Sequence, residues 1–266
     1  SKNGQLRLAQ ASAHHDHRCR HRLARAFVAG KLANMRTMLL RANRKRQEPA
    51  LAQAAAAIKG ALAEVEKLPA DEEAPDPVRP QADSAYGRLH GLEGNASAHY
   101  FNCFPQLLNN PELFHGRTRR PPRDPANALL SYGYTILLHQ VTSALGTVGL
   151  DPYVGYLHGS QYGKPALALD LMEEFRSLIV DSVVLTVFNN GSIQERDFVE
   201  QFGSYRLTDR GRRTFLARLE ARFEEQIRHP IFEYRASYRR CLELQARLLA
   251  KTVQGEIPTY PPFTVR

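Results

Sequence analysis

The sequence has 266 residues, a formal net charge of +9 and a pI near 9.6, so it can bury one large core and its charge suits a protein that binds polyanions. The longest apolar run, residues 178–188, contains Asp181 and is too short to span a bilayer, and no signal-peptide pattern is present, so we expect a soluble, cytoplasmic protein without a membrane span. The three cysteines are widely separated and lack paired metal-binding spacing, which indicates reduced thiols and excludes a disulfide framework.

The N-terminal region predicts an arm followed by a basic helix. Residues 1–19 begin polar and without an apolar period, so we predict a connecting arm there. The string HHDHRCRH, residues 14–21, is too crowded for a metal cluster and indicates a solvated, basic helix start. Over residues 20–46, apolar residues at helical spacing predict one buried stripe: Val28, Leu32, Met35 and Leu39. Arg25 and Arg36 share nearly one face, which could follow a phosphate backbone or be an ordinary solvated face.

Two further helices are predicted next, with a loop between them. Residues 50–67 are rich in alanine, a strong helix former. Residues 68–80 contain four prolines and four acids, which predict a loop. Glu93 then opens a second helical stretch, whose apolar residues recur three and four apart: Ala96, Tyr100, Phe101 and Phe104.

An irregular basic segment precedes the next predicted helix. It spans residues 117–125 and carries four arginines: Arg117, Arg119, Arg120 and Arg123. Asp124 is well placed to cap the helix that follows, with Pro125 at its first position. Asn127 lies in the first turn of that helix, where its residue type favours a core or capping role.

The segment LHGSQYGKPALALDLMEEFR, residues 157–176, combines a histidine with acids among apolar neighbours. A loop after His158 should return the chain to a helix that contains Asp170 and Glu173, one turn apart on one face. Glu174 is rotated by about 100° from Glu173 and should face elsewhere. His158 and Glu173 can therefore meet across the loop.

Glu93, His158 and Glu173 together form a donor set that can hold a divalent metal in an otherwise basic protein. Carboxylate oxygens suit Mg²⁺, and the imidazole also suits Mn²⁺. The spacing alone equally allows three unrelated surface or ion-pair residues. The remainder of the chain, from residue 177, predicts further buried and amphipathic helices, so we expect a mainly α protein with one helical domain over residues 20–266.

Three long strings resemble the signature segments of the CRISPR spacer-acquisition integrases, the Cas-one (Cas1) family. They are LEGNASAHYF at 92–101, RTRRPPRDPANALLSYGYTILL at 117–138 and GLDPYVGYLHGSQYGKPALALDLMEEFR at 149–176, in the family's order. The basic helix ARAFVAGKLANMRTMLLR, residues 24–41, resembles the helix that begins the family's helical domain. The resemblance covers most of the chain from residue 24 onward, and its motifs are long and ordered.

The resemblance implies a multi-helix, metal-dependent catalytic domain. Glu93, His158 and Glu173 match the family's metal-binding positions, with Asp170 in the supporting acidic position, and Asn127 is expected to line the catalytic pocket. Two features depart from the family. Ser97 and Ala98 stand where members often carry Ala-Arg, and the usual N-terminal β domain is expected to be absent from this chain.

The implied function is insertion of protospacer DNA into the CRISPR repeat by attack of a 3′-hydroxyl on a phosphodiester, with Mg²⁺ or Mn²⁺ as cofactor. The implied partners are a second copy of the chain, a small ferredoxin-like Cas-two (Cas2) protein, and a possible fused reverse transcriptase or nuclease domain. Basic residues are expected to contact the DNA: Arg25, Arg36, Arg119, Arg120, Arg123 and Arg176. Two alternatives stay open. One is a non-catalytic nucleic-acid-binding scaffold of the same complex, and the other is a nuclease for branched DNA that uses the same site.

Overall fold

The computed structural model describes residues 3–69, 84–159 and 161–265, and it confirms a mainly α fold. Most of the predicted loop at 68–80 lies outside the described residues. The longer helices are α1 (Gly4–His15), α2 (His17–Arg46), α3 (Pro49–Lys67), α4 (Ala85–Asn102), α5 (Pro125–Val148), α6 (Ala166–Met172), α7 (Ser182–Asn189), α8 (Asp209–Glu224) and α9 (Tyr238–Val253). Short 3-10 turns lie at Phe104–Leu107, Pro111–Leu113 and Glu195–Asp197, and a π-helical turn at Ser177–Asp181. Two antiparallel hairpins pair β1 (Phe198–Gln201) with β2 (Ser204–Leu207) and β3 (Gln226–Arg228) with β4 (Arg235–Ser237).

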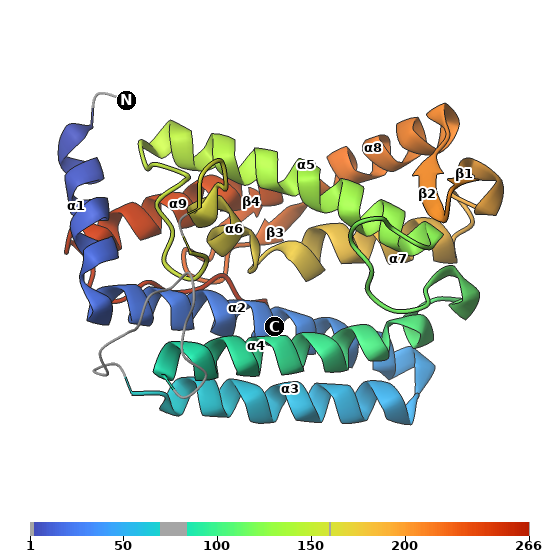
Figure 1. The fold of residues 1–266 in the computed structure, drawn as a ribbon, viewed down its shortest axis with the longest axis horizontal. Helices are drawn as coiled ribbons and strands as arrows, with labels where there is room; N and C mark the ends of the chain where they lie inside the picture. The colour runs from blue at the N-terminus through green and yellow to red at the C-terminus, as the bar shows by residue number, and fades with distance from the viewer. Residues whose placement is uncertain (1–2, 70–83, 160, 266) are drawn as a thin grey trace.

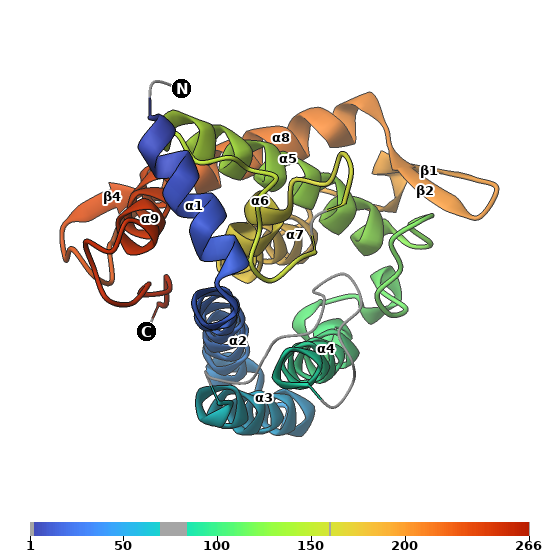
Figure 2. The same ribbon diagram turned by 60° about the vertical axis from the view of Figure 1, so that its left-hand side comes forward.

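The helices form two groups with a short segment between them (Figures 1 and 2). Helices α2, α3 and α4 pack on one another in the first group, while α5 and α8 both pack against α9 in the second. The segment from α6 through the π turn contacts α2 on one side and α5 on the other. It therefore lies between the two groups, where side chains from both can reach it.

Helix α1 corrects the prediction of a connecting arm over residues 1–19. Residues 4–15 are helical and pack against α2 and α9, with Leu6, Gln10 and Ala13 buried. The apolar period is missing because one of the buried positions is a glutamine, whose amide bonds to main-chain groups of another segment. Further division of the chain, with a catalytic domain over residues 20–266, stays a prediction.

Helix α2 is the longest in the described chain, and it has clear start and stop signals. The Asp16 carboxylate caps it by accepting from the backbone N–H groups of Arg18 and Cys19. Gln47, with φ +54°, ends it in the left-handed conformation. The predicted stripe of Val28, Leu32, Met35 and Leu39 is buried. Its first turns are less solvated than expected, since Arg20 and His21 are also buried.

The C-terminal tail is fixed against α2 and the central segment by Glu174. The carboxylate accepts from the Phe263 N–H at 2.7 Å and from the Tyr260 hydroxyl at 2.9 Å. The Asn34 side-chain amide donates to the Glu174 carbonyl at 2.8 Å and to the Phe263 carbonyl at 2.7 Å. Burial raises the pKa of Glu174 to about 8, against the effect of its hydrogen-bond donors. As predicted, Glu174 faces away from the surroundings of its neighbour Glu173.

His229 forms the buried turn of the β3–β4 hairpin and packs edge-on against Phe263 of the tail. Its Nδ1 accepts from the backbone N–H groups of Ile231 and Phe232 at 3.2 and 3.3 Å, so this nitrogen carries no proton. Nε2 is buried and has no hydrogen-bond partner among the described residues. Burial lowers the pKa of the imidazole from 6.5 to about 4, because a charged ring here would lose both solvation and its two donors.

We therefore predict an acid-sensitive free energy of unfolding that depends on His229. A histidine with a lowered pKa in the folded state stabilises the fold fully above pH 6.5 and loses this contribution as the pH falls toward 4, by up to about 3 kcal/mol. His229→Asn keeps an acceptor near the Nδ1 position but cannot titrate there. Urea unfolding at pH 7.5 and pH 5 should show a smaller drop for the variant than for the wild type. Equal drops in both proteins would contradict the assignment.

Candidate functional site

The loop that carries His158 is held in place by helix α1. The Gln10 side-chain amide donates to the Asp151 carbonyl at 2.8 Å and accepts from the Asp151 N–H at 2.8 Å. One turn further along α1, His14 Nδ1 lies 2.6 Å from the Gly155 carbonyl. The segment predicted as an arm thus supports the loop that presents the histidine.

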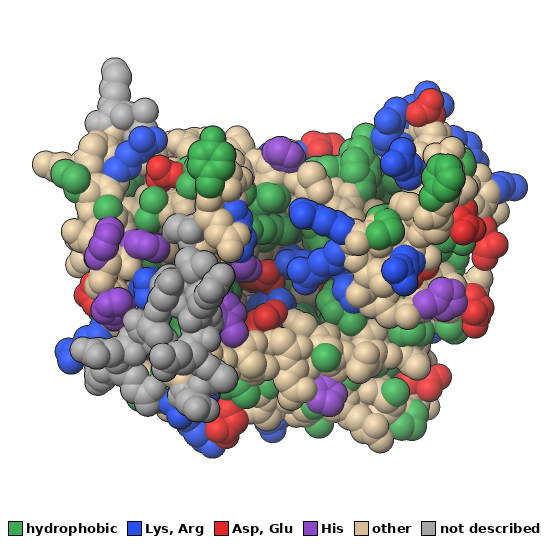
Figure 3. All heavy atoms as spheres, in the orientation of Figure 1, with side chains coloured by type: hydrophobic (Ala, Val, Ile, Leu, Met, Phe, Trp, Pro, Cys, Tyr) green, Lys and Arg blue, Asp and Glu red, His purple; other side chains and the backbone are tan. Residues whose placement is uncertain are grey.

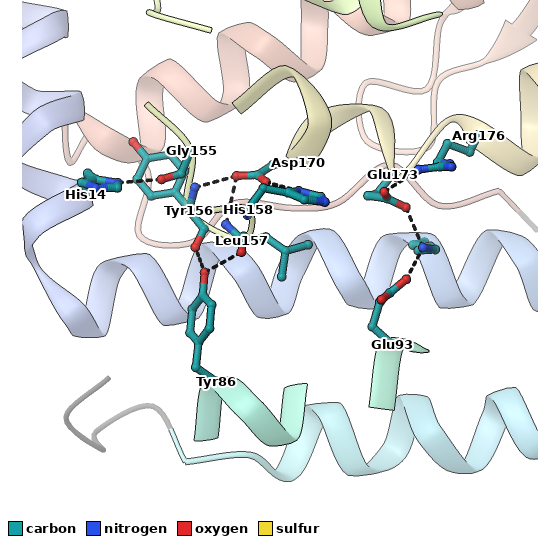
Figure 4. A network of polar contacts seen from close by, with 11 residues as sticks. His14, Tyr86, Glu93, Gly155, Tyr156, Leu157, His158, Asp170, Glu173 and Arg176 are labelled. Atoms are coloured by element: carbon teal, nitrogen blue, oxygen red, sulfur yellow. Dashed lines mark hydrogen bonds and ion pairs between the residues drawn. The ribbon is translucent and has the colours of Figure 1, made fainter. Parts of the chain in front are cut away.

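Helix α4 holds the same loop and also supplies an acid. The Tyr86 hydroxyl donates to the carbonyls of Tyr156 and Leu157, the latter at 3.0 Å. Glu93 lies seven residues, or two turns, further along and so on the same face of the helix. Figure 4 shows Tyr86 and Glu93 both projecting from this helix toward the loop and the central segment.

The loop wraps around the carboxylate of Asp170, which is fully buried. The backbone N–H groups of Tyr156, Leu157 and His158 donate to it at 2.5, 3.0 and 2.8 Å, and His158 Nδ1 lies 2.7 Å from its Oδ1. A carboxylate with these donors is an acceptor, so Nδ1 of His158 carries the proton. Nε2 is then left with a free lone pair. In Figure 4 the ring extends from Asp170 toward Glu173.

Lys31 of helix α2 connects the two glutamates predicted as metal ligands. Its ammonium forms an ion pair with Glu93 Oε1 and another with Glu173 Oε2, at 2.7 Å in the second case. Arg176 binds the other oxygen of Glu173 at 2.8 Å. Lys31 was not among the residues predicted from the sequence, although its spacing carried a signal. It lies three residues after Val28 and four before Met35, within the buried stripe, where a lysine requires an acidic partner.

Both glutamates are ionised at neutral pH. Burial on its own would raise the pKa of Glu173, but Arg176 and Lys31 together hold it below its usual range. Burial and Lys31 oppose each other in the same way at Glu93, and the pKa again falls below its usual value.

The donor set fits a divalent cation once Lys31 withdraws. As the side chains stand, no three Asp, Glu, His or Cys residues in the described chain surround a point that could hold a metal ion. Glu173 Oε2 accepts no hydrogen bond of ordinary geometry from the described residues, although the Lys31 ammonium is 2.7 Å away. A buried, ionised oxygen without a proper donor, beside a second carboxylate and an imidazole lone pair, is typical of a cation site. Convergence of Glu93, His158 and Glu173 on one ion stays a prediction.

A cavity of about 380 Å³ opens over these acids, and arginines lie in its wall. Figure 3 shows the hollow between the two helix groups, with acidic side chains at its base and Lys or Arg side chains around them. The basic residues that line it are Lys31, Arg117, Arg119 and Arg176. Its volume is that of a site for a nucleotide-sized group, within the roughly 300–1,000 Å³ of ligand pockets.

Asn127 lies behind this cavity and positions Arg117. The Asn127 amide oxygen accepts from Arg117 at 2.7 Å and from the Thr118 N–H at 3.0 Å, while its nitrogen donates to Gly116 and Asp124. The expectation that Asn127 lines the pocket is not supported, since it is fully buried and absent from the lining. The predicted cap and core role is the one observed. Asp124 caps the helix through the Asn127 N–H, as predicted.

The π turn at Ser177–Asp181 interrupts the predicted helix and widens the spacing between residues that lie on one face. The helix is correct up to Met172, and residues 173–175 form a turn because the Glu174 carbonyl bonds to Asn34 instead of continuing the helix. Arg176 and Asp181, five residues apart, both line the cavity. Asp181 accepts from the hydroxyls of Tyr100 and Tyr134. Such π turns occur often at functional sites.

The other predicted DNA contacts fall into two groups. Arg120 and Arg123 are exposed on the loop before α5, next to the cavity-lining Arg119. Arg25, in contrast, binds the carbonyls of Val65 and Glu66 at the end of α3, at 3.1 and 2.6 Å. Its guanidinium therefore caps a helix and does not reach the cavity, and Arg36 is half-buried elsewhere on α2.

At Ser97 and Ala98, where the sequence departs from the family pattern, other contacts support the site. The Ser97 hydroxyl donates to Glu93 Oε1 at 2.9 Å and so supports the ionised carboxylate. Ala98 lines the cavity without a charge, and Arg117 and Arg119 enter the same cavity from the loop before α5. Positive charge in the cavity thus comes from another part of the chain.

A larger cavity, of about 580 Å³, lies at the β3–β4 hairpin. Its arginines are already engaged: Arg228 pairs with Glu233 at 3.0 Å, and Arg222 binds the Leu178 carbonyl and Glu225. Its acids, Glu225 and Glu233, are the partners of these arginines, and the Nδ1 of its histidine, His229, already accepts from two backbone N–H groups. We therefore place the functional site at the smaller cavity.

The sequence matches the family model described as CRISPR associated protein Cas1 over residues 1–221. The chain belongs to the Cas1 family. It is 44% identical to the CRISPR-associated endonuclease Cas1 3 of Thermus thermophilus, over all of this chain and 73% of the relative. It is 43% identical to a CRISPR-associated exonuclease Cas4/endonuclease Cas1 fusion of Geobacter sulfurreducens, over 92% of this chain and 42% of the fusion.

Solved structures agree with this assignment. A Cas1 protein from Thermotoga maritima aligns with a TM-score of 0.77 and 28% identity, over 95% of this chain and 71% of that one. A Cas6-RT-Cas1–Cas2 complex contains a chain that aligns with a TM-score of 0.80 and 28% identity, over all of this chain and 27% of that one. A casposase bound to its integration product shares the fold, with a TM-score of 0.80 and 23% identity. Among the described residues, none of the helices is long and apolar enough to cross a membrane.

Gly155 allows the close approach that brings His158 to Asp170, and its replacement should disturb the loop. A Cβ at this position would lie 2.7 Å from the carbonyl carbon of Ala166 and 2.9 Å from the Leu167 nitrogen, so backbone must move. We predict that Gly155→Ala lowers the free energy of unfolding by about 1–3 kcal/mol. Gly146→Ala is the matched control, because its Cβ meets nothing within 4 Å on a helix that alanine favours. Urea unfolding of both variants measures the difference, and equal stabilities would refute the tight contact.

Proposed function

We propose that this chain is the catalytic domain of a CRISPR adaptation integrase, which joins protospacer DNA to a repeat by attack of a 3′-hydroxyl on a phosphodiester. One observation carries the proposal. Two ionised glutamates, joined by Lys31, line a cavity whose wall carries arginines, and His158 of fixed tautomer extends toward Glu173 from the adjoining loop (Figure 4). Membership of the Cas1 family, whose named relatives are endonucleases, supports the same chemistry.

Glu93, Glu173 and Nε2 of His158 would hold Mg²⁺ or Mn²⁺, with Asp170 as the supporting acid. When bound, such an ion stabilises the charge that builds up on a phosphate and makes a hydroxyl a better nucleophile. Oxygen donors suit either ion, and the imidazole makes Mn²⁺ a particularly good fit.

The chain's own residues account for binding and orientation. Asp170 holds the His158 ring through Nδ1, so the free nitrogen keeps one direction. Arg119 and Arg176 line the cavity and are placed to bind the non-bridging oxygens of a phosphate, while Asn127 fixes Arg117 beside them. A strand transfer exchanges one phosphodiester for another, so no covalent protein nucleophile is required.

Integration of both DNA ends requires two such sites at a fixed distance. We infer that a second copy of the chain and a Cas2-like partner provide this arrangement. The inference is supported by the similarity to the Cas1 portion of a Cas6-RT-Cas1–Cas2 complex. Relatives also exist as fusions with Cas4, so a fused polymerase or nuclease domain is compatible with this chain.

Glu93→Gln and Glu173→Gln test the proposal, because each keeps the shape of the side chain and removes its charge. Strand transfer of a 3′-hydroxyl DNA end into a repeat-bearing plasmid with Mn²⁺ should fall by at least about 10²-fold, and His158→Ala should behave alike. Glu256→Gln, at an exposed ion pair with Lys251, is the control and should be fully active.

DNA binding measured without metal separates the alternatives. We expect the three site variants to bind within about twofold of the wild type, since the removed groups are not phosphate contacts. Loss of binding and activity together would favour a DNA-binding scaffold instead. Strand cleavage without joining, lost in the same variants, would favour a nuclease in which water replaces the hydroxyl.

The arginines of the loop before α5 should contribute to the salt dependence of DNA binding. Each phosphate contact contributes about 0.9 to the slope of log affinity against log salt. The exposed pair Arg119 and Arg120, replaced together by Ala, should reduce the slope by about two. Arg25→Ala should leave it unchanged, because that guanidinium binds carbonyls of α3. The reverse pattern in fluorescence-anisotropy titrations would contradict this placement of the DNA.

A further inference from the structure

The Lys31 ammonium would compete with a bound metal ion for the same carboxylate oxygens of Glu93 and Glu173. Its ion pairs with Glu93 Oε1 and Glu173 Oε2 use one oxygen from each proposed glutamate ligand. The Lys31 side chain is only 11% exposed, so the ammonium has left most of its water for these partners. The remaining oxygen of Glu173 binds Arg176, and among the described residues Lys31 is the cation that pairs with both acids.

We propose that Lys31 is a built-in substitute for the metal, which keeps the site assembled when it is empty and couples metal binding to DNA binding. The inference rests on the proposed function, because it takes Glu93 and Glu173 as the metal ligands. Two ionised carboxylates facing each other in a buried site repel strongly unless a cation lies between them. Lys31 supplies that cation in the absence of metal.

A divalent ion and the ammonium cannot share these oxygens, since like charges at such short range repel each other. Metal binding therefore requires Lys31 to move away. The four-carbon stem of a lysine permits this, whereas the helix that carries it is anchored on both sides, by its buried stripe and by Asn34. The displaced ammonium stays within the same cavity, where an unpaired charge is costly.

A DNA phosphate in the cavity removes that cost by giving the ammonium a new anionic partner. Arg119 and Arg176 line the same cavity as Lys31, so a phosphate that they bind would share this cavity with the Lys31 ammonium. DNA should accordingly raise the affinity for metal, and metal should raise the affinity for DNA by the same factor. The site then loads its metal mainly when a substrate is present.

The test is a direct titration of Mn²⁺, followed by the electron paramagnetic resonance signal of the free ion, on the 266-residue chain. Lys31→Met removes the ammonium and keeps much of the stem. Lys251→Met is the matched control, because it removes a lysine from an exposed ion pair with Glu256. The DNA is a duplex with blocked 3′ ends, so no strand transfer occurs during the titration.

Without DNA, Lys31→Met should bind Mn²⁺ at least about tenfold more tightly than the wild type, and Lys251→Met should match the wild type. Adding the duplex should increase the wild-type affinity several-fold and that of Lys31→Met much less. An unchanged or weaker Mn²⁺ affinity in Lys31→Met, with an equal effect of DNA in both proteins, would overturn the inference while leaving the metal site standing. Absence of Mn²⁺ binding in every protein, with or without DNA, would overturn the metal site as well.

Thermal melting provides a second readout that does not depend on activity. Without metal, Lys31→Met should melt below the wild type because Glu93 and Glu173 then lose the cation between them and only Arg176 still pairs with Glu173, and added Mn²⁺ should close the gap. Lys31→Gln serves as a second variant if Lys31→Met fails to fold. A Lys31 variant as stable as the wild type without metal would show that the ammonium does not hold the empty site together.

Discussion

The structure depends on the burial of three carboxylates from one short segment, Asp170, Glu173 and Glu174. A buried carboxyl group, charged or neutral, is tolerated only with hydrogen-bond partners or cations around it, so each acid requires its own set of partners. The Asp170 carboxylate accepts hydrogen bonds from the loop that carries His158. Glu173 forms ion pairs with Lys31 and Arg176. Glu174 is held by the C-terminal tail. These hydrogen bonds and ion pairs bring the N-terminal helices, the central loop and the tail together around the three acids.

Helix α2 serves two of these acids from adjacent turns. Lys31 compensates Glu173, while Asn34, three residues later, binds the main chain of Glu174. Neighbouring glutamates that point in opposite directions are thereby fixed by one rigid helix, which leaves little freedom for the direction of Glu173. Glu173, a proposed metal ligand, is therefore positioned both by its own ion pairs and by the contacts of Glu174.

Local features, such as apolar spacing and helix caps, could be predicted from the sequence, whereas contacts between distant segments could not. The buried stripe of α2 and the Asp124 cap were predictable because apolar spacing and capping act within a few residues. Glu93, His158 and Glu173 were identified by chemistry and resemblance; Glu93 and Glu173 line one cavity, and the His158 ring extends toward Glu173 from the adjoining loop (Figure 4). Helix α1 was missed because Gln10, a buried polar residue, breaks its apolar period. The π turn likewise has no local sequence signal.

The contacts that assemble the site also determine the stage of folding at which the site forms. Gln10 reaches across 141 residues to the His158 loop, and Asn34 reaches across 229 residues to the tail. Contacts of such high sequence separation form late, after the cost of closing long loops has been met. A chain that has been synthesised only as far as residue 259 lacks the segment that surrounds Glu174. The proposed catalytic centre would in this way be assembled only after residues 260–263 have been added to the chain and have packed against Glu174.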